Sequence, residues 1–271
     1  MIVPVTDAAD TRLDPFRWRE RQLASRTERR EQVGAGMFVA EGDLVVSRAI
    51  ESGAIPVALL CDARQAEVLS RRVTEAVPVF VGDDALRKEV TGLGVPLSAT
   101  GLFVRPALVD PGALLDACAH VVVLEAIDNP TNVGAILRSA AALGWDGILL
   151  DATSADPLAR RALRVSMGTA LSVPFARGGD GASIAQLLSS RGFDTYATTP
   201  DASAADISRV DRPRGARTAL LLGSERTGLG PELLSAAAAT PVRIPMHAGT
   251  DSLNVGAAAA IALHVLGPNG R

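Results

Sequence analysis

The sequence predicts an α/β fold, and three observations support this fold class. Short apolar runs alternate with segments of helical character along most of the chain. Hydrophobic residues make up 48% of the 271 residues, which is enough for a substantial core. A segment with two prolines and one glycine, residues 106–112, divides this alternation into two parts. We therefore expect two α/β parts joined by a linker.

The first part, residues 1–105, is expected to be a small α/β domain. Residues 1–11 are expected to form a loose terminus. The Arg-rich segment 12–32 is expected to hold a helix, because it contains no Gly and few prolines. The other expected elements are a helix over 45–50, a strand over 58–61, a helical segment over 65–73 and a strand over 77–81.

The second part begins after the linker, which we place at residues 106–117, and is expected to form one domain over 118–271. Strands are expected over 121–124, 147–150, 194–198, 219–222 and 242–244. Helices are expected over 132–142, 157–167 and 184–190. Such alternation predicts a mostly parallel sheet with helices on both faces.

The segment IPMHAGTDSLNVGAAAAIALH, residues 244–264, is the most informative part of the chain. A short apolar strand ends at Met246, a polar turn follows, and Ser252 and Asn254 open a helix of Ala, Ile, Leu and Val. Polar residues suit a helix start because the first amides lack intrahelical partners. An apolar helix of this kind is expected to be buried on nearly all sides. The residues alone are equally consistent with a capped core helix and with a ligand-gripping loop.

Two other segments favour the ligand-gripping interpretation. They are NPTNVGAILRSAAALGWDGILL, residues 129–150, and LLLGSERTGLGPELL, residues 220–234. In this order and spacing, the three segments resemble motifs 1, 2 and 3 of the SpoU (TrmH-like) branch of the SPOUT RNA methyltransferases. The resemblance covers residues 118–267. The upstream segment FVAEGDLVVSRAI, residues 38–50, resembles the start of the small L30e-like substrate-binding domain that many members carry.

The resemblance implies a fold, a reaction and partners. The fold would be a SPOUT domain with a deep trefoil knot, formed by the chain from about residue 219 to the final helix. The reaction would transfer a methyl group from S-adenosylmethionine to a ribose 2′-hydroxyl of RNA, with no metal. The RNA would be rRNA, with 23S rRNA favoured over tRNA. The protein would form a homodimer through the knotted domain.

The resemblance also implies five catalytic-site residues. Arg138 matches the family's catalytic Arg, and it would activate the 2′-hydroxyl either as a base or by electrostatics. The cost of burying a charge without a partner suggests a functional role for an Arg on an apolar helix, but without the motif a solvated helix face is equally consistent with it. Asn132 opens the same helix, and Glu225 would orient the cofactor loop or the first motif. Ser252 and Asn254 match the polar pair placed near the methyl donor and the target ribose.

The cofactor would be held by the loops that follow two strands. In the resemblance, the backbone groups of Ile244 and Met246 bond the adenine and Leu253 packs on it. Gly at the end of a strand lets a ligand approach the backbone, and ligands of open α/β sheets bind at that edge. The expected cofactor-binding residues are Leu222, Gly223, Ile244, Met246, Ser252, Leu253 and Asn254.

The segment RALRVSMGTALSVPF, residues 161–175, resembles the family's region between motifs 1 and 2. Its matched positions are Arg164, Ser166 and Gly168, and Arg164 is expected to contact an RNA phosphate or the active site. The chain departs from the family pattern at Thr250-Asp251, where a more apolar residue is expected, and at Gly256, where a small polar residue is usual.

Charge and aromatic content limit how the chain could bind RNA. The net charge of −3 argues against a generally basic RNA-coating protein, and an aromatic content of 3% argues against base stacking as a major binding mode. Residues 12–30 nevertheless hold seven Arg against three acidic residues. Lys88 is the single Lys beside 26 Arg. Arg suits phosphates, but a composition bias explains this preference equally well. We expect RNA binding to need this region and to be salt-sensitive.

Other residue types narrow the function further. Cys61 and Cys118 are isolated, so neither a disulfide framework nor a zinc site is expected. The three histidines lack metal-ligand spacing, and the loop of Arg212, Arg214 and Arg217 is expected to be a solvated surface. No apolar signal segment is present and the longest apolar run, residues 255–266, is too short to span a membrane. A cytoplasmic location without membrane contact is therefore expected.

Two alternatives remain open. A non-catalytic RNA-binding protein could retain the fold, although the intact motif residues argue against it. A nucleotide-dependent oxidoreductase of the doubly wound class would need a G-x-G-x-x-G fingerprint, which DNPTNVGAILR, residues 128–138, does not supply.

Overall fold

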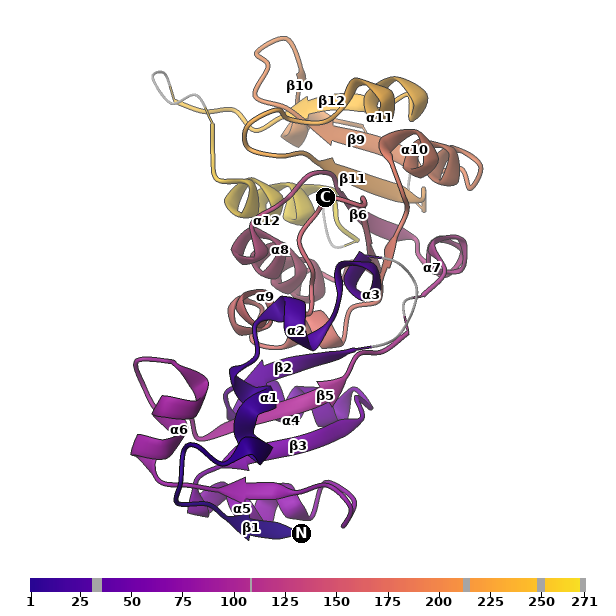
Figure 1. The fold of residues 1–271 in the computed structure, drawn as a ribbon. Helices are drawn as coiled ribbons and strands as arrows, with labels where there is room; N and C mark the ends of the chain where they lie inside the picture. The colour runs from indigo at the N-terminus through magenta and orange to yellow at the C-terminus, as the bar shows by residue number, and fades with distance from the viewer. Residues whose placement is uncertain (31–35, 108, 212–214, 248–251, 269–271) are drawn as a thin grey trace. The chain divides into compact units, whose positions relative to one another are not determined.

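The computed structural model describes residues 1–30, 36–107, 109–211, 215–247 and 252–268. Contacts divide the chain into two compact units (Figure 1). Unit 1 comprises Met1–Ala107 and Leu158–Ser172, and unit 2 comprises Leu108–Pro157 and Val173–Arg271. The segment 158–172, expected to fold with the second domain, is therefore grouped with unit 1.

Unit 1 is built on a five-stranded mixed sheet. Its strands are β1 (Ile2–Pro4), β2 (Met37–Glu41), β3 (Pro56–Cys61), β4 (Val79–Val81) and β5 (Ala99–Val104), in the order β1-β4-β3-β5-β2. β1, β4 and β3 are parallel, whereas β5 is antiparallel to both β3 and β2. The expectation of a loose N-terminus is wrong, because Ile2 pairs with Val79 and extends the sheet.

The helices of unit 1 are short. They are α1 (Asp14–Arg17), α2 (Glu20–Leu23), α3 (Arg26–Arg30), α4 (Asp43–Glu51), α5 (Ala63–Ser70), α6 (Asp84–Thr91) and α9 (Arg160–Val165). The expected helix over 12–32 is broken into separate turns, because Trp18 and Ala24 adopt extended backbone with ψ of 139° and 136°. These breaks turn Phe16 and Leu23 into the core beside β3 and β4.

Unit 2 contains a seven-stranded sheet in which every neighbouring pair is parallel. The strands are β6 (His120–Leu124), β7 (Gly147–Leu150), β8 (Phe175–Arg177), β9 (Asp194–Thr198), β10 (Ala205–Asp206), β11 (Thr218–Leu222) and β12 (Thr240–Arg243). Their order is β10-β12-β9-β11-β6-β7-β8. This arrangement confirms the parallel sheet that the sequence predicts.

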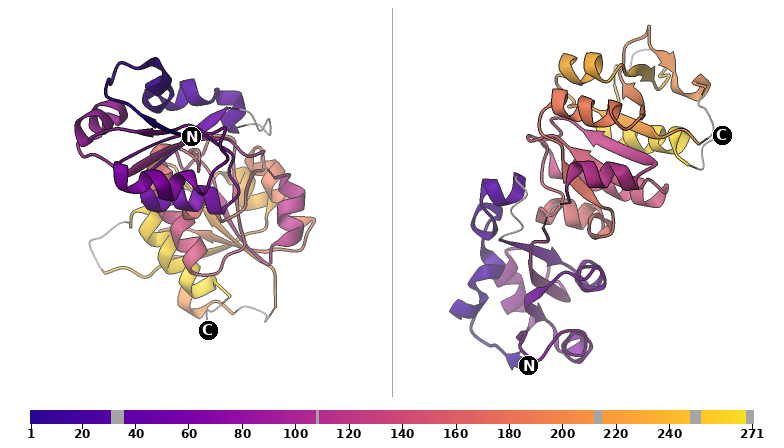
Figure 2. Two further views of the ribbon diagram at one scale, coloured as in Figure 1. Left: turned by 90° about the horizontal axis from the view of Figure 1, so that it is seen from below. Right: turned by 90° about the vertical axis from the view of Figure 1, so that its right-hand side faces the viewer.

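Helices cover both faces of this sheet (Figures 1 and 2). On one face, α7 (Pro111–Ala117), α10 (Gly181–Ser189) and α11 (Pro231–Ala236) pack on alternate strand residues such as Val121, Val123 and Leu221. On the other face lie α8 (Pro130–Ala142) and α12 (Val255–Leu266), and α12 contacts both α8 and β11. Because strand side chains alternate between faces, both sides of each central strand are buried and the strands are almost wholly apolar.

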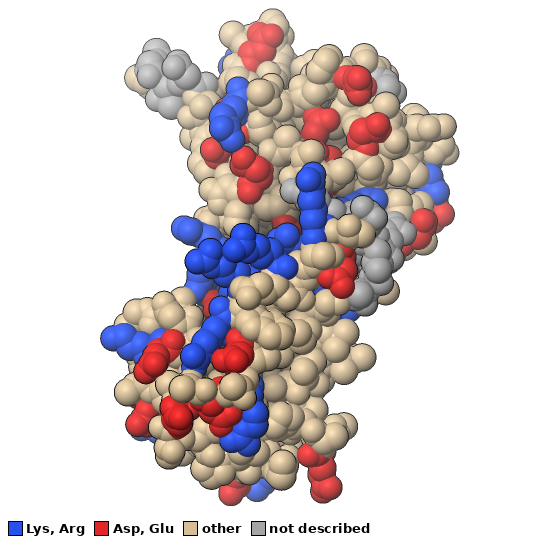
Figure 3. Space-filling model, viewed as in Figure 1, with Lys and Arg blue, Asp and Glu red and all other residues tan. Residues whose placement is uncertain are grey.

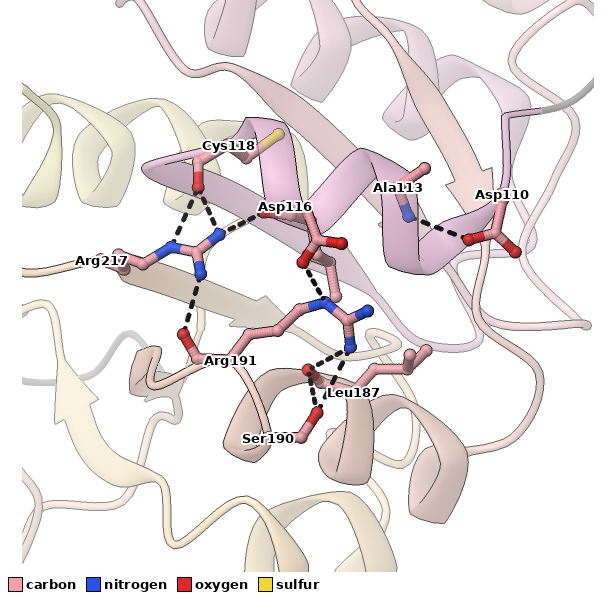
Figure 4. A network of polar contacts seen from close by, with 9 residues as sticks. Asp110, Ala113, Asp116, Cys118, Leu187, Ser190, Arg191 and Arg217 are labelled. Atoms are coloured by element: carbon pink, nitrogen blue, oxygen red, sulfur yellow. Dashed lines mark hydrogen bonds and ion pairs between the residues drawn. The ribbon is translucent and has the colours of Figure 1, made fainter.

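A polar network joins the elements at the amino edge of the unit 2 sheet (Figure 4). Arg217 donates from Nη2 to the Cys118 carbonyl at 2.9 Å and from Nη1 to the Arg191 carbonyl at 2.9 Å, and its guanidinium lies 4.2 Å from the Phe193 ring centroid. Arg191 in turn pairs with Asp116 on α7 at 2.7 Å. The expectation that Arg217 is a solvated loop residue is therefore wrong. Arg212 and Arg214 lie outside the described residues.

The final helix α12 is not buried all round in the single chain. Val255, Ala259, Ala262 and Leu263 are buried, whereas Ile261 is 40% exposed. Ala257 and His264 are exposed on the same side as Ile261, at helical spacing. The expected all-round burial is therefore wrong for one chain, and an apolar stripe of α12 is left open.

Two broader features concern the described part of the chain. No helix there combines the length and the hydropathy that crossing a lipid bilayer requires. No group of three His, Cys, Asp or Glu side chains comes together there in a way that could hold a metal ion.

Candidate functional site

The motif residues gather at the carboxyl edge of the unit 2 sheet. There β6 and β11 lie side by side, and the Glu125 amide donates to the Leu222 carbonyl at 3.0 Å. From β6 the chain continues to β7 on one side, whereas the other neighbour of β11 is β9. The strand order therefore changes direction between β6 and β11. Such switch points form the crevice in which parallel sheets bind ligands.

The first motif forms the start of α8. Asn129 is the N-cap, its side chain accepts from the Thr131 amide at 2.9 Å, and Pro130 occupies the first helical position. This start places Asn132 in the first turn, where its side chain is turned inward and the residue is only 6% exposed.

The second motif is a tight loop after β11. The Gly228 amide donates to the Ser224 carbonyl at 2.9 Å, and Gly228 has a φ of 68°, which favours glycine. The hydroxyls of Ser224 and Thr227 lie 2.8 Å apart across the same turn. Glu225 lies within this closed loop, so its carboxylate is presented from a fixed backbone.

Asn132, Glu225 and Asn254 form one polar cluster, although they come from three distant segments. Asn132 Nδ2 donates to Glu225 Oε1 at 3.1 Å, and Asn254 Nδ2 donates to the same oxygen at 2.7 Å. The Val255 amide donates to it at 3.3 Å, and Asn254 Nδ2 also lies 3.1 Å from Asn132 Oδ1. A carboxylate accepts such bonds more strongly than a neutral oxygen. Glu225 therefore acts as the hub that holds the first and third motifs together.

Asn254 has a second role as the N-cap of α12. Its Oδ1 accepts from the Gly256 amide at 3.0 Å and from the Ala257 amide at 3.4 Å. The departure at Gly256 has a packing reason, because a Cβ there would lie 3.3 Å from the Ala135 Cβ and 3.1 Å from Asn254 Oδ1. Glycine thus allows α12 to approach α8 closely. The helix-capping and site roles expected for Asn254 coexist.

Arg138 is not part of this cluster. It lies on the exposed side of α8, whereas Asn132, Ile136 and Leu137 are buried. The structure therefore places Arg138 on the solvated face of its helix rather than amid the apolar side chains.

The expected cofactor residues line the same edge with mixed exposure. Leu222 is buried, Ile244 and Met246 are half-buried, and Leu253 is 37% exposed. In the described parts of the chain, the backbones of Ile244 and Met246 make no hydrogen bond of a turn or loop. Their amides and carbonyls are thus suited to bonding a planar ring.

The remaining cofactor positions complete this edge. Gly223 is half-buried directly after β11, and Ser252 is exposed just before α12. Thr250 and Asp251, the departure in the third motif, lie outside the described residues.

Sequence reasoning missed Glu125, the residue directly after β6. Its Oε2 accepts from the Gly230 amide at 2.6 Å, at the N-cap of α11. Glycine at both Gly181 and Gly230 makes room for it, since an added Cβ would lie 2.8 Å and 3.1 Å from Glu125 Oε1. Glu125 therefore holds the end of the second-motif loop. The signal was available, because a carboxylate directly after a buried strand is placed at the ligand edge of the sheet.

The matched residues between the first two motifs are in unit 1. Arg164 forms an ion pair with Glu41 at 3.0 Å, and Ser166 is fully buried with its hydroxyl donating to the Leu163 carbonyl at 3.1 Å. Gly168 has a φ of 81°, and a Cβ there would lie 3.3 Å from Arg48. These residues shape α9 and its packing on unit 1, whereas the cluster around Glu225 belongs to unit 2.

Comparison with known proteins agrees with this geometry. The SpoU rRNA Methylase family model matches residues 119–264, a range that contains all three motifs. The chain belongs to the SpoU rRNA methylase family. Its resemblance to this family, which was first carried by the three motifs, is thereby confirmed.

Known proteins resemble this chain over different parts of its length. An uncharacterized tRNA/rRNA methyltransferase of Mycobacterium tuberculosis is 37% identical over 270 residues, covering 96% of this chain and 90% of that protein. The 23S rRNA (adenosine(1067)-2′-O)-methyltransferase of Streptomyces azureus is 37% identical over 154 residues, or 56% of each chain. The crystal structure of an AdoMet-bound rRNA methyltransferase from Sinorhizobium meliloti superposes with a TM-score of 0.80 at 25% identity. It covers 97% of this chain and 96% of that one.

Proposed function

We propose that this SpoU protein transfers a methyl group from S-adenosylmethionine to a ribose 2′-hydroxyl of RNA. The observation that carries the proposal is the meeting of Asn132, Glu225 and Asn254 at the switch point of the parallel sheet. The Streptomyces azureus relative is named as a 23S rRNA 2′-O-methyltransferase, which favours 23S rRNA over tRNA as the substrate.

The residues at this edge fit the methyl donor. The half-buried Ile244 and Met246 offer backbone donors and acceptors for an adenine, and Leu253 offers an apolar side chain to cover it. Leu222 and Gly223 would form the floor. A Cβ on Gly223 would lie 2.3 Å from the carbonyl carbon of Gly228, so glycine here lets the second-motif loop fold back against the end of β11. The donor supplies a methyl group on a positively charged sulfur, so the chain needs no metal to activate it.

The chain's own task is to position the ribose and help to remove its proton. Glu225 fixes the Asn132 and Asn254 amides, so that these groups hold one orientation when RNA binds. Ser252 is exposed two residues before Asn254, and we propose that it contacts the donor or the ribose. We propose that Arg138 activates the 2′-hydroxyl through orientation and charge, because a guanidinium only donates hydrogen bonds and offers no acceptor for the hydroxyl proton.

We also propose a homodimer, because the exposed stripe of α12 offers a surface that a second copy would cover. α8 and α12 run parallel: Asn132 meets Asn254 at one end, and the Trp145 indole donates to the Leu263 carbonyl at 3.0 Å near the other. The stripe of Ala257, Ile261 and His264 would be covered by a second copy. Arg138 would then act at a site that the second copy completes.

We propose that unit 1 supplies RNA contacts. We propose that residues 1–105 act as the RNA substrate-binding part and residues 118–271 as the methyltransferase part. The expected linker 106–117 is only partly a linker, because its second half is α7, which packs in the core of unit 2. The exposed arginines of the 12–30 stretch support this assignment, because they present charge to phosphates. The trefoil knot and the cytoplasmic location remain predictions.

The proposal is tested by mapping ribose methylation in a strain that lacks this protein. We expect one ribose in rRNA to lose its methyl group, to regain it when the gene is restored, and to stay unmethylated with Arg138→Ala. Loss of a tRNA methyl group would move the substrate to tRNA. An unchanged methylation map would favour the non-catalytic RNA-binding alternative.

Calorimetry separates the donor from other nucleotides. The purified protein is expected to bind S-adenosylmethionine and not NAD. Binding of NAD but not of the methyl donor would overturn the proposed function and favour the oxidoreductase alternative.

A further inference from the structure

Glu41, the last residue of β2, is a buried carboxylate with two arginine partners. Its side chain is only 2% exposed, and Arg160 Nη1 lies 2.9 Å from its Oε1. Arg164 Nη1 lies 3.0 Å from its Oε2 as an ion pair that lacks hydrogen-bond geometry. A buried charge without partners would be strongly destabilising, so Glu41 requires α9 to be docked beside β2.

Arg160 is fully occupied by this docking. Its Nη2 donates to the carbonyls of Phe16 at 3.0 Å and Trp18 at 2.8 Å, which lie at the end of α1. Its backbone amide donates to Glu20 Oε1 at 2.8 Å. The start of α9 is therefore tied to the Arg-rich stretch, and the Glu20 and Glu41 carboxylates are both engaged by α9.

Other arginines around α9 keep all or part of their side chains exposed to solvent. Arg161 is exposed, and the Arg164 side chain is 40% exposed. Arg19 and Arg21 flank Glu20 and are exposed, and Arg48 Nη1 donates to the Met167 carbonyl at 2.5 Å just beyond the end of α9. Figure 3 shows Lys and Arg side chains gathering in the region of α2 and α9. We call Arg19, Arg21, Arg48, Arg161 and Arg164 the α9 arginine surface.

We propose that the α9 arginine surface binds the phosphate backbone of RNA, and that Glu41 is the positioning residue that holds α9 within it. This inference rests on the proposed function and deepens it. Arg161 and Arg164 are three residues apart on one helix, so their Cβ atoms lie about 5–6 Å apart and both can engage one stretch of backbone. Arg donates in a planar fork that matches phosphate oxygens. Glu20 and Glu41 are both bonded to Arg160, so these two carboxylates do not pair with the exposed arginines Arg19, Arg21 and Arg161.

The first experiment measures the salt dependence of RNA binding. A fluorescently labelled RNA stem-loop is titrated with the full-length protein and with the double variant Arg161→Ala/Arg164→Ala over a range of salt concentrations. Each lost phosphate contact lowers the slope of log K against log salt by about 0.7–0.9, so the double variant should lose about 1.4–1.8. The matched control is Arg71→Ala, an exposed Arg at the C-cap of α5 that pairs with Glu67 and lies outside the surface. Equal slopes for the double variant and the control would overturn the proposal.

The second experiment tests Glu41 itself. Glu41→Gln makes the protein one unit more positive, so charge alone predicts tighter RNA binding. Positioning predicts weaker binding, because Arg160 and Arg164 lose their anchor. Glu41→Asp keeps the charge on a shorter side chain, and it should also weaken binding at unchanged net charge. If both variants bind the stem-loop as tightly as the original protein, Glu41 does not position the surface.

The third set of measurements separates positioning from folding and from the proposed function. Circular dichroism and thermal unfolding follow the fold, and in an Arg164→Ala background the effect of Glu41→Gln on RNA binding should shrink. Calorimetry with S-adenosylmethionine should be unchanged in every variant. A protein that methylates no RNA but shows the expected slopes would refute the proposed function and leave the surface standing. If polyglutamate competes for the surface and the RNA stem-loop does not, the partner is an acidic protein and the RNA proposal fails.

Discussion

Replacing Glu225 with alanine should destabilise unit 2, because one oxygen of this side chain holds three N–H donors. They are Asn132 Nδ2 at 3.1 Å, Asn254 Nδ2 at 2.7 Å and the Val255 amide at 3.3 Å. Asn132 is only 6% exposed, so in Glu225→Ala its amide would lose its partner with little access to water.

The magnitude follows from how buried each donor is. Leaving a buried donor unsatisfied costs about 1–3 kcal/mol. The Asn254 side chain and Glu225 are exposed, so water replaces much of their bond and adds little to the loss. We therefore expect Glu225→Ala to lower the free energy of unfolding by about 1–3 kcal/mol. Glu225→Gln keeps an acceptor but loses its charge near the start of α12, and it should cost about 0.3–1 kcal/mol.

The assay is urea unfolding followed by tryptophan fluorescence. Trp18 is in unit 1 and Trp145 in unit 2, so a Trp18→Phe background leaves one reporter. Trp145 is 3% exposed and donates to the Leu263 carbonyl of α12, which makes its emission sensitive to the helix that Glu225 supports. With a slope of about 2 kcal/mol/M, a loss of about 2 kcal/mol moves the midpoint by about 1 M.

A matched control decides whether the cluster is responsible. Glu232 is an exposed acid in the first turn of α11, and Glu232→Ala should lower the free energy of unfolding by less than about 1 kcal/mol. If Glu225→Ala and Glu232→Ala lower the midpoint equally, the carboxylate is not the hub of the cluster.

Three further predictions concern other parts of the chain. Glu125→Ala should loosen the second-motif loop and raise the Kd for S-adenosylmethionine, whereas Glu125→Gln should largely preserve it; an unchanged Kd in the alanine variant would contradict this role. Burial raises the pKa of the Cys61 and Cys118 thiols to about 11, so both stay protonated at pH 8. A thiol reagent should label the native protein slowly at pH 8 and faster as the pH approaches 11, and immediate labelling of both thiols would show that they are accessible. Ile261→Asp should convert a dimer to monomers in sedimentation, whereas Val68→Asp, at another exposed apolar position, should not; a wild-type monomer at micromolar concentration would refute the dimer.

Strong local patterns made much of unit 2 predictable from the sequence. The apolar runs that became β6, β7 and β11 were recognisable as strands, and the polar start of the last helix identified Asn254 as its N-cap. Asn132 was expected to open its helix, but Asn129 is the N-cap and Asn132 lies in the first turn. Glu225 followed from the motif rather than from its surroundings, because its partners lie 93 and 29 residues away along the chain.

Other features depend on contacts that local patterns do not contain. β1 is only three residues long and exists because β4 offers an unpaired edge. The exposed side of α12 could not be separated from its buried side by composition, since every residue of the helix other than His264 is apolar or glycine. The grouping of α9 with unit 1 involves contacts such as the one between Arg160 and Glu41, which lie 119 residues apart. Pairs so far apart are set by the fold and carry no periodic signal.

The central claim is that this protein methylates a ribose, and the most direct measurement locates the methyl group chemically. Unmodified rRNA transcribed in vitro is incubated with the protein and S-adenosylmethionine carrying an isotopically labelled methyl group, then digested to nucleosides and analysed by mass spectrometry. We predict label in one 2′-O-methylnucleoside, at a single position, and its absence with Arg138→Ala. Label on a base, or no label in rRNA or tRNA from a protein that binds the donor, would contradict the account.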